Sequence, residues 1–257
     1  MGEIAAYGDT VNIITEPTIS VQAYTRGQII NPQDLIDNQI TLTIDKANSF
    51  SFKVDDIEAR QSHIEWLDLA SQSAAYTIKD TFDAEVLEYM RTQATAAITY
   101  GSTGTPIDLG FSSGEVTPLQ VLNRISRLLD EANVPTDNRW MVAAPVFWEQ
   151  MADESSKLVG VDFTGDGSST LRNGRISEGL IRNFRCYRSN NLLTTNTSGV
   201  NWVLCGHMSS TSVASQIAKT EQYRDPYSFA DVVRGLHMYG RKVLRTNALG
   251  LVYYSVD

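Results

Sequence analysis

The sequence is poor in cysteine and has no long apolar run. Its two cysteines, Cys186 and Cys205, are not spaced as C-x-x-C, which argues against a zinc site and favours buried, reduced thiols over a disulfide. No apolar run approaches the roughly 20 residues that a membrane-spanning helix needs. Glu3 and Ala6 stand where a signal peptide and a myristoylation motif need other residues. We therefore expect a cytoplasmic protein with no membrane partner.

Catalytic signatures are also missing. The three histidines, His63, His207 and His237, lie far apart, and no nucleophile elbow, zinc-protease motif or phosphate-binding glycine loop occurs. The enzyme alternative, a soluble α+β hydrolase, would need a triad assembled from distant residues. The sequence therefore predicts no catalytic residue and no cofactor.

Calcium binding is a second candidate chemistry with little support. Residues 162–167, Asp-Phe-Thr-Gly-Asp-Gly, are similar to the opening of a calcium loop, but Asn173 stands where a bidentate Glu is needed. We interpret this stretch as a flexible glycine-rich loop and predict no metal site.

Positive charge is scarce. Acidic residues outnumber basic ones by 30 to 21, and the formal net charge is -9 at pH 7. Because DNA affinity comes mainly from Lys and Arg displacing counterions from phosphates, this balance argues against tight DNA binding. The chain has 257 residues, 42% of them hydrophobic, and can bury a core in one large or two modest domains.

Two short segments alternate apolar and polar side chains, and the turn-like residues 46–49 separate them. The apolar positions are Ile40, Leu42, Ile44, Phe50, Phe52 and Val54. The pattern predicts a two-stranded hairpin with one apolar face. Since an isolated hairpin is marginal in water, that face must rest on something else, and the core of its own domain is the simplest possibility.

From about Glu58 the apolar spacing becomes helical, and no Gly or Pro interrupts the chain between Pro32 and Gly101. This predicts a long helix over residues 58–100, which Gly101 ends. The Gly- and Ser-rich residues 101–116 are predicted to be a linker.

Strand and helix signals alternate in the second half. Thr117 can cap a helix that has Pro118 at its first position. Residues 134–145 combine turn residues, an apolar strand and Pro145, which a first helical turn tolerates. A second strand at residues 201–206 is predicted to lead into a helix capped by Ser209 or Ser210. Two such units fit a central sheet covered by helices.

Residues 134–145, V-P-T-D-N-R-W-M-V-A-A-P, resemble the axial-domain segment of tailed-bacteriophage major capsid proteins of the Hong Kong 97 fold. Residues 179–192 and 235–249 resemble later strands of that family, with Cys186 and Thr246-Asn247 in place of its usual residues. With an early strand at residues 8–13, the matches extend over nearly the whole chain. The matching axial-domain residues are Pro135, Asp137, Arg139, Trp140 and Pro145.

The resemblance implies an α+β fold with an axial domain, a peripheral domain that contains a long spine helix, and an extension-loop β-hairpin. The implied division is a peripheral strand at 1–17, the extension loop at 18–57, the spine helix at 58–100, a linker at 101–116, the axial domain at 117–218, and peripheral return strands with a closing axial strand at 219–257.

The same resemblance implies a function. The protein would be a major capsid protein whose copies form pentamers and hexamers of an icosahedral shell around double-stranded DNA. It would assemble in the host bacterial cytoplasm with scaffolding and portal proteins and end in the virion. An encapsulin-type compartment has the same fold and is the alternative. The implied contacts with a neighbouring subunit are Ile40, Leu42, Ile44, Lys46, Phe50, Phe52 and Val54.

Two family features are not expected here. Relatives usually carry an N-terminal arm ahead of the Gly-Glu-Ile stretch, which begins at Met1 in this sequence, so contacts of that arm are not carried over. Some relatives join a lysine near the extension loop to an asparagine of a neighbour. Lys46 and Lys53 are available, but nothing in the sequence shows that an Asn and a Glu lie beside either one in space, and we expect no such link.

Overall fold

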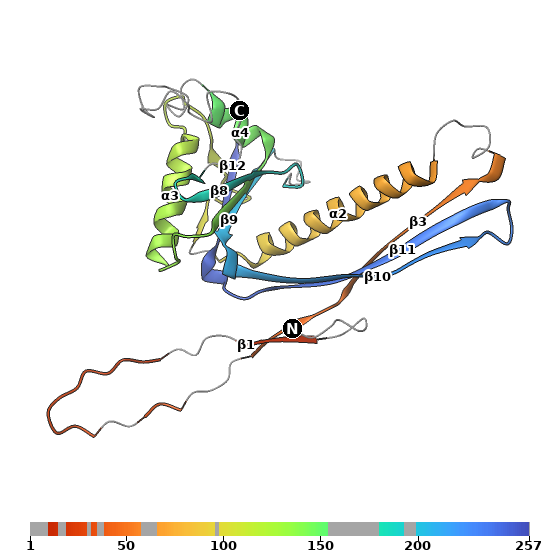
Figure 1. The fold of residues 1–257 in the computed structure, drawn as a ribbon. Helices are drawn as coiled ribbons and strands as arrows, with labels where there is room; N and C mark the ends of the chain where they lie inside the picture. Colours follow the sequence, from red (N-terminus) through yellow and green to blue (C-terminus); the bar gives the residue numbers. More distant parts are fainter. Residues whose placement is uncertain are drawn as a thin grey trace. The chain divides into compact units, whose positions relative to one another are not determined.

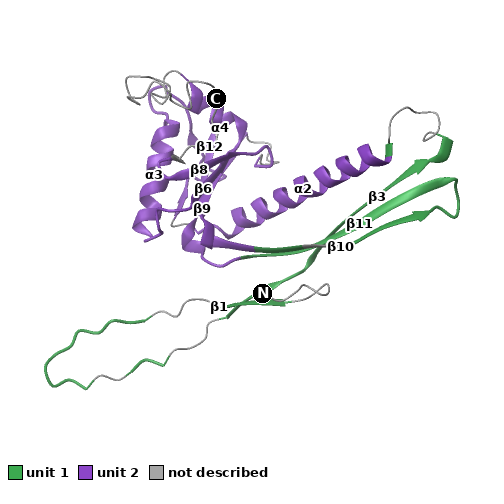
Figure 2. Ribbon diagram, in the orientation of Figure 1, with its two compact units in different colours: residues 1–66, 213–242 green, residues 67–212, 243–257 purple. Residues whose placement is uncertain are grey.

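The computed structural model describes residues 10–14, 19–29, 32–34, 39–57, 66–95, 98–153, 180–192 and 199–256. The chain divides into two compact units (Figure 2). Unit 1 comprises residues 1–66 and 213–242, and unit 2 comprises residues 67–212 and 243–257. The glycine-rich stretch from Asp162, considered above as a calcium loop, lies outside the described residues.

Unit 1 is built from long antiparallel strands (Figure 1). A three-stranded sheet has the order β10–β11–β3, and β1 pairs antiparallel with β2 in a separate two-stranded sheet. The strands are β1 (Thr10–Ile14), β2 (Gln39–Thr43), β3 (Lys46–Asp55), β10 (Thr211–Arg224) and β11 (Ala230–Val243).

The predicted hairpin is wrong in its pairing, although both of its segments are strands with the predicted alternation. β2 pairs with β1, and β3 pairs with β11 over a register from Ala230↔Asp55 to Tyr239↔Lys46. The expected turn at residues 46–49 is part of β3. The physical reason is length: β11 offers all ten residues of β3 a ladder partner, whereas β2 has only five residues.

The core of unit 1 lies where the two sheets approach each other. Leu42, Ile44 and Met238 are buried there, with Val11, Ile13 and Ala214 packed against them. A Cβ at Gly240 would lie 2.4 Å from the backbone oxygen of Thr43, so glycine is what lets β11 pass this closely. The apolar face of β2 therefore rests on its own chain.

Unit 2 is organised around a mixed seven-stranded sheet of order β4–β12–β9–β6–β8–β7, with β5 beside β12. β6 runs parallel to β8 and antiparallel to β9, and β9 runs antiparallel to β12. The strands are β4 (Thr99–Tyr100), β5 (Ile107–Asp108), β6 (Arg139–Ala143), β7 (Leu180–Ile181), β8 (Phe184–Arg188), β9 (Asn201–His207) and β12 (Leu249–Ser255).

Two amphipathic helices, α3 (Pro118–Glu131) and α4 (Pro145–Ala152), cover one face of this sheet. Thr117 caps α3 as predicted, in a capping box with Gln120, and Pro145 is the first residue of α4 as predicted. The main core lies between them and the sheet, and its helical members are Val121, Leu122, Ile125, Leu129, Phe147, Trp148 and Met151.

The other face of the sheet packs against the last turns of the long helix α2 (Trp66–Gln93), where Leu87 and Met90 pack against the buried cluster that contains Trp202. Arg91 lies over the Trp202 ring and donates from Nη1 to the Tyr253 hydroxyl at 3.1 Å. The long helix predicted over residues 58–100 is thus present over residues 66–93, and residues 58–65 lie outside the described part. Its predicted end is wrong, because residues 99–100 form the short strand β4, which pairs with β12. No helix in the described ranges is long and apolar enough to cross a membrane.

The predicted linker at residues 101–116 contributes to the sheet and the core. β5 pairs with β12, Ile107 and Leu109 are buried in the main core, and Val116 donates its N–H to Asp108 O at 2.8 Å. Glycine and serine at its ends provide turns, but the apolar segment between them is long enough to form a short strand.

The predicted helix after residue 206 is also wrong. Residues Met208–Ser210 form a single 3-10 turn, capped by the His207 side chain, and the long strand β10 follows. Thr211 and Val213 are β-branched and therefore favour a strand. The sequence pattern around them does not show that β11 is available as a pairing partner.

The two cysteines lie on strands that flank β6. Cys186 in β8 and Cys205 in β9 are both register partners of Met141, so they are two strand spacings apart, about 9–10 Å. A disulfide needs Cα atoms within about 7 Å. Both thiols are free, as predicted, and burial raises the pKa of Cys186 to about 11 and that of Cys205 to about 12.

We predict that neither thiol reacts with a thiol-specific reagent at about pH 8 in the native chain, and that both react after denaturation, because only the thiolate is nucleophilic. Between pH 9 and these raised pKa values the folded chain holds protons that the unfolded chain has lost. The free energy of unfolding should therefore fall as the pH rises above 9. Rapid native labelling of Cys205 would contradict this packing.

Candidate interaction site at the β10–β11 turn

The turn between β10 and β11, residues 225–229, presents two aromatic side chains to solvent. Tyr227 is 95% exposed and Phe229 is 81% exposed. Ile57, just beyond β3, is also exposed. One exposed apolar residue is ordinary, but two exposed aromatic rings in one short turn form a surface that gains free energy when a partner covers it.

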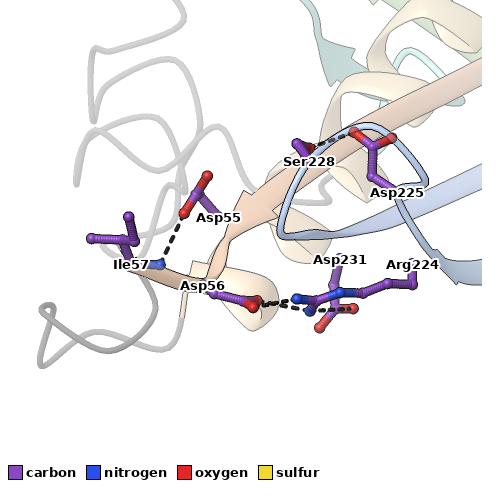
Figure 3. Close-up of polar contacts among 7 residues, drawn as sticks. All are labelled: Asp55, Asp56, Ile57, Arg224, Asp225, Ser228 and Asp231. Atoms are coloured by element: carbon purple, nitrogen blue, oxygen red, sulfur yellow. Dashed lines mark hydrogen bonds and ion pairs between the residues drawn. The ribbon is translucent and has the colours of Figure 1, made fainter.

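Hydrogen bonds to Asp225 hold the turn in shape (Figure 3). Its carboxylate accepts from the Ser228 hydroxyl at 2.6 Å and from the Tyr227 N–H at 3.0 Å. Its own N–H donates to Ala230 O at 3.0 Å. The Ser228 hydrogen bond, followed by the Tyr227 N–H, lowers the pKa of Asp225. The carboxylate therefore stays ionised and keeps both bonds at neutral pH.

Arg224 ties the turn to the end of β3. Its guanidinium pairs with both carboxylate oxygens of Asp56, with Nη1 at 2.8 Å from Oδ1, and it lies 3.4 Å from Asp231 Oδ1 (Figure 3). The hydrogen bond to Asp56 raises the pKa of Arg224 above its ordinary value. Asp56 N–H also donates to Phe229 O at 3.0 Å, and Asp55 Oδ1 accepts from Ile57 N–H at 2.9 Å.

The turn is thus fixed by polar bonds, while its aromatic rings remain uncovered. A fixed backbone lowers the conformational entropy lost on binding, and aromatic anchors provide much of the binding energy at protein interfaces. This arrangement suits an interaction site for another macromolecule. In the described residues, no three His, Cys, Asp or Glu side chains form a group that could hold a metal.

The structure places the predicted subunit-contact residues in different environments, from buried to exposed. Leu42 and Ile44 are buried in the core of unit 1, which removes them as contacts for a neighbour because their own chain covers them. Ile40 is half-buried and Lys46 is exposed. The alternative in which this face packs on its own subunit is therefore correct for Leu42 and Ile44.

Phe50, Phe52 and Val54 share one face of β3 and are half-buried. The Phe50 and Phe52 rings stack with centroids 6.2 Å apart and an interplanar angle of 15°. Their register partners are Gly235 and Val233, not residues of β2. A Cβ at Gly235 would lie 2.2 Å from the Phe50 ring, so the ring fills the space left by the glycine.

The axial-domain motif residues have mainly structural positions around Arg139, which is 1% exposed at the start of β6. Its Nε donates to Pro135 O at 2.8 Å, and its Nη2 donates to Val134 O at 2.6 Å and to Asp130 Oδ1 at 2.7 Å. These bonds join the end of α3 to β6. Asp137 and Pro145 are exposed, and Trp140 is half-buried.

Sequence reasoning missed the β10–β11 turn. Its signal is Asp-Pro-Tyr-Ser-Phe at residues 225–229, turn chemistry that carries two aromatics. Because the sequence pattern predicts a helix after Ser209 or Ser210, it does not reveal the strand that leads into this turn.

The fold matches those of solved phage structures. A chain from Mycobacterium phage Che8 is 28% identical, with a TM-score of 0.67, covering 97% of this chain and 84% of that one. The capsid structure of cyanophage P-SCSP1u is 14% identical with a TM-score of 0.71, covering 98% of this chain and 84% of that one. The mature capsid of bacteriophage PhiM1 is 15% identical with a TM-score of 0.66, covering 98% of this chain and 82% of that one. The fold is therefore the α+β fold of phage shell subunits.

The family model of the phage capsid protein matches residues 37–254, and the chain belongs to this family. It is a major capsid protein, a structural protein of the virion that assembles with copies of itself into a shell. This assignment favours the viral function over the encapsulin-type compartment. No curated protein matches the chain.

We predict that Arg139→Met lowers the free energy of unfolding by about 3 kcal/mol, because the carbonyls of Val134 and Pro135 lose a buried donor. Asp130→Asn removes the ion-pair partner, whose side chain is half-exposed, and should cost about 1 kcal/mol or less. Calorimetric melts measure both. Equal losses in the two variants would mean that the ion pair, not the carbonyl bonds, is the important interaction.

Proposed function

We propose that copies of this capsid protein close into pentamers and hexamers of an icosahedral shell around double-stranded DNA. Heterologous contacts that close into rings provide such assemblies. Assembly would take place in the host bacterial cytoplasm, with scaffolding and portal proteins as partners. The observation that supports this most is the family match over residues 37–254, joined to a fold shared with phage capsids along nearly the whole chain.

The domain names of the Hong Kong 97 fold are part of the same proposal. The seven-stranded sheet with α3 and α4 would be the axial domain, and β12 its closing strand. Helix α2 would be the spine helix, and β3, β10 and β11 would belong to the peripheral domain. The order of these elements along the chain supports the assignment.

We assign the extension-loop contact to residues 19–29, not to the buried face of β2. Val21 is 96% exposed and Ile29 is 85% exposed. Gln33 Oε1 accepts from the Ser20 N–H at 3.1 Å and from the Ser20 hydroxyl at 2.9 Å, which brings the two sides of the loop together. Apolar side chains on a loop of this kind gain free energy when a neighbouring subunit covers them.

The aromatic turn at residues 225–229 is the second proposed contact between subunits. Its rings are exposed in the single chain, and its shape does not depend on their packing. Contacts of this size are individually weak, because association costs several kcal/mol of translational and rotational freedom. Weak contacts let a misplaced subunit leave before the shell closes.

We predict that the native protein forms shells or capsomer-sized oligomers, and that Val21→Asp with Ile29→Asp leaves folded subunits that fail to close shells. The carboxylates would be desolvated at every copy of the contact. Electron microscopy and light scattering measure assembly, and thermal melts measure folding. A native protein that stays a stable monomer would contradict the proposed function, whereas normal shells from the variant would contradict only the role of the loop.

We predict that Tyr227→Ser with Phe229→Ser also keeps the subunit folded, with a melting temperature close to native, but reduces assembly strongly. The control is Ile44→Asp, which places a carboxylate in the unit 1 core and should cost several kcal/mol, roughly 3 or more. Circular dichroism separates the two effects. A turn variant that melts like the core variant would show that the rings stabilise the subunit itself.

A further inference from the structure

Strand β3 has an open edge with a short uncharged segment. The three-stranded sheet has the order β10–β11–β3, so within the described ranges only one side of β3 has a ladder partner. Residues 47–52, ANSFSF, carry no charge, and Lys46 and Lys53 flank them. Charged side chains on an edge strand discourage pairing with another chain, and residues 47–52 lack them. The backbone groups on this open edge can therefore pair with an added strand.

The two faces of residues 47–52 differ. The stacked rings of Phe50 and Phe52 are half-buried on one face, and Ser49 and Ser51 are exposed on the other. On the β11 side the register partner of Phe50 is Gly235, which has no side chain to cover the ring. A strand on the open side would place its own side chains beside the rings, because cross-strand neighbours interact. The open edge thus suits a strand that is apolar at every second residue.

Residues 19–24 have this pattern. Their sequence, ISVQAY, alternates apolar and polar residues up to Ala23 and includes no charge. All of them are exposed, Ile19 by 70% and Val21 by 96%. The segment belongs to no helix or strand of the described structure. It therefore has the alternation of a strand without a partner in its own chain.

One edge of residues 19–24 is used within the chain, and the other is open. Ser20 N–H donates to Gln33 Oε1 at 3.1 Å. In an extended segment alternate N–H groups point to opposite edges, so those of Val21 and Ala23 point away from Gln33. In the described part of the chain, residues 19–24 make no backbone–backbone hydrogen bond. The edge that contains the Val21 and Ala23 donors is therefore available to another strand.

We propose that residues 19–24 of one copy add as a strand to the open edge of β3 in a second copy, along residues 47–52. The inference rests on the proposed function and specifies how the extension-loop contact is made. The two segments are equally long, about 20 Å as strands, and they do not pair within the single chain. Ladder hydrogen bonds would provide affinity, and Ile19 and Val21 beside the two phenylalanine rings would provide specificity. Such a contact is heterologous and can close rings.

The first test removes backbone donors from one edge of the segment at a time. Val21→Pro with Ala23→Pro removes two N–H groups from the proposed pairing edge. The control, Gln22→Pro with Tyr24→Pro, removes two from the opposite edge. Proline keeps the backbone extended and is tolerated in an edge strand where its nitrogen faces away from the ladder. Full-length subunits of both variants and of native protein are assembled in parallel, with electron microscopy and light scattering for shells and circular dichroism for folding.

The first variant should give at least about tenfold fewer closed shells than native protein, and the control should stay within about twofold of native. Equal yields from the two variants would overturn the proposal. If Val21→Asp with Ile29→Asp blocks shells while both proline variants assemble, the loop makes its contact through side chains alone. Strand addition would then be wrong, and the proposed function would stand.

Hydrogen exchange on native protein is a second measurement, and it needs no variant. A new ladder protects the amides that face it, so exchange in residues 19–24 and 47–52 should slow at least about tenfold when free subunits assemble. Exchange in β10, the other edge strand of this sheet, should change little. Unchanged exchange in residues 47–52, or slowing in β10 instead, would overturn the proposal. Native protein that forms no shells would contradict the proposed function and this inference with it.

Discussion

Burial of the central sheet of unit 2 on both faces is the constraint on which most of this structure depends. In β9, Val203 and Cys205 belong to the core beneath α3 and α4, while Trp202 and Leu204 belong to the core beneath α2. A strand that is apolar on both sides needs a layer on each face. The C-terminal turns of α2 provide the second layer and anchor the long helix to the sheet at that end. Val86, which lies in this half of the helix, is the single buried residue of α2.

Polar groups complete this unit where apolar packing ends. The chain turns sharply between α3 and β6, and backbone carbonyl groups in this turn are buried and need a hydrogen-bond donor. Arg139 satisfies two of them and reaches Asp130 at the end of α3. A guanidinium is suited to this position because its donors are arranged in a fixed plane and can bind several acceptors at once. Arg139 of the axial-domain motif therefore has a structural role, because it holds the end of α3 against β6.

Local signals were enough to predict part of the fold. Thr117 and Pro118 mark the start of α3, and Pro145 marks the start of α4. These starts are predictable because the first turn of a helix depends on residues that are close together in the sequence. Strand pairing was not predictable in this way. Lys46 pairs with Tyr239, and nothing near β3 indicates a partner so distant in the sequence. The site was missed because the residues after Ser210 are predicted to be helical, so the hairpin of β10 and β11 that presents Tyr227 and Phe229 is not expected, and composition alone suggests that aromatic residues are buried.

Subunits that all carry a net charge of -9 repel one another, so their association must depend on surfaces where charge is absent or matched. The exposed rings of the β10–β11 turn, which we propose as a subunit contact, would meet this need, because an apolar contact is not weakened by the charge of the subunits. Its frame of Asp225, Arg224 and Asp56 is polar and in contact with solvent, with Arg224 exposed and the two carboxylates half-buried, and so it can form before any partner binds. Under the proposed contact, folding and assembly use different groups: the buried sheet stabilises the subunit, and side chains that the fold leaves uncovered would stabilise the contact. This separation lets a capsid subunit stay soluble when free and still gain free energy when it joins a shell.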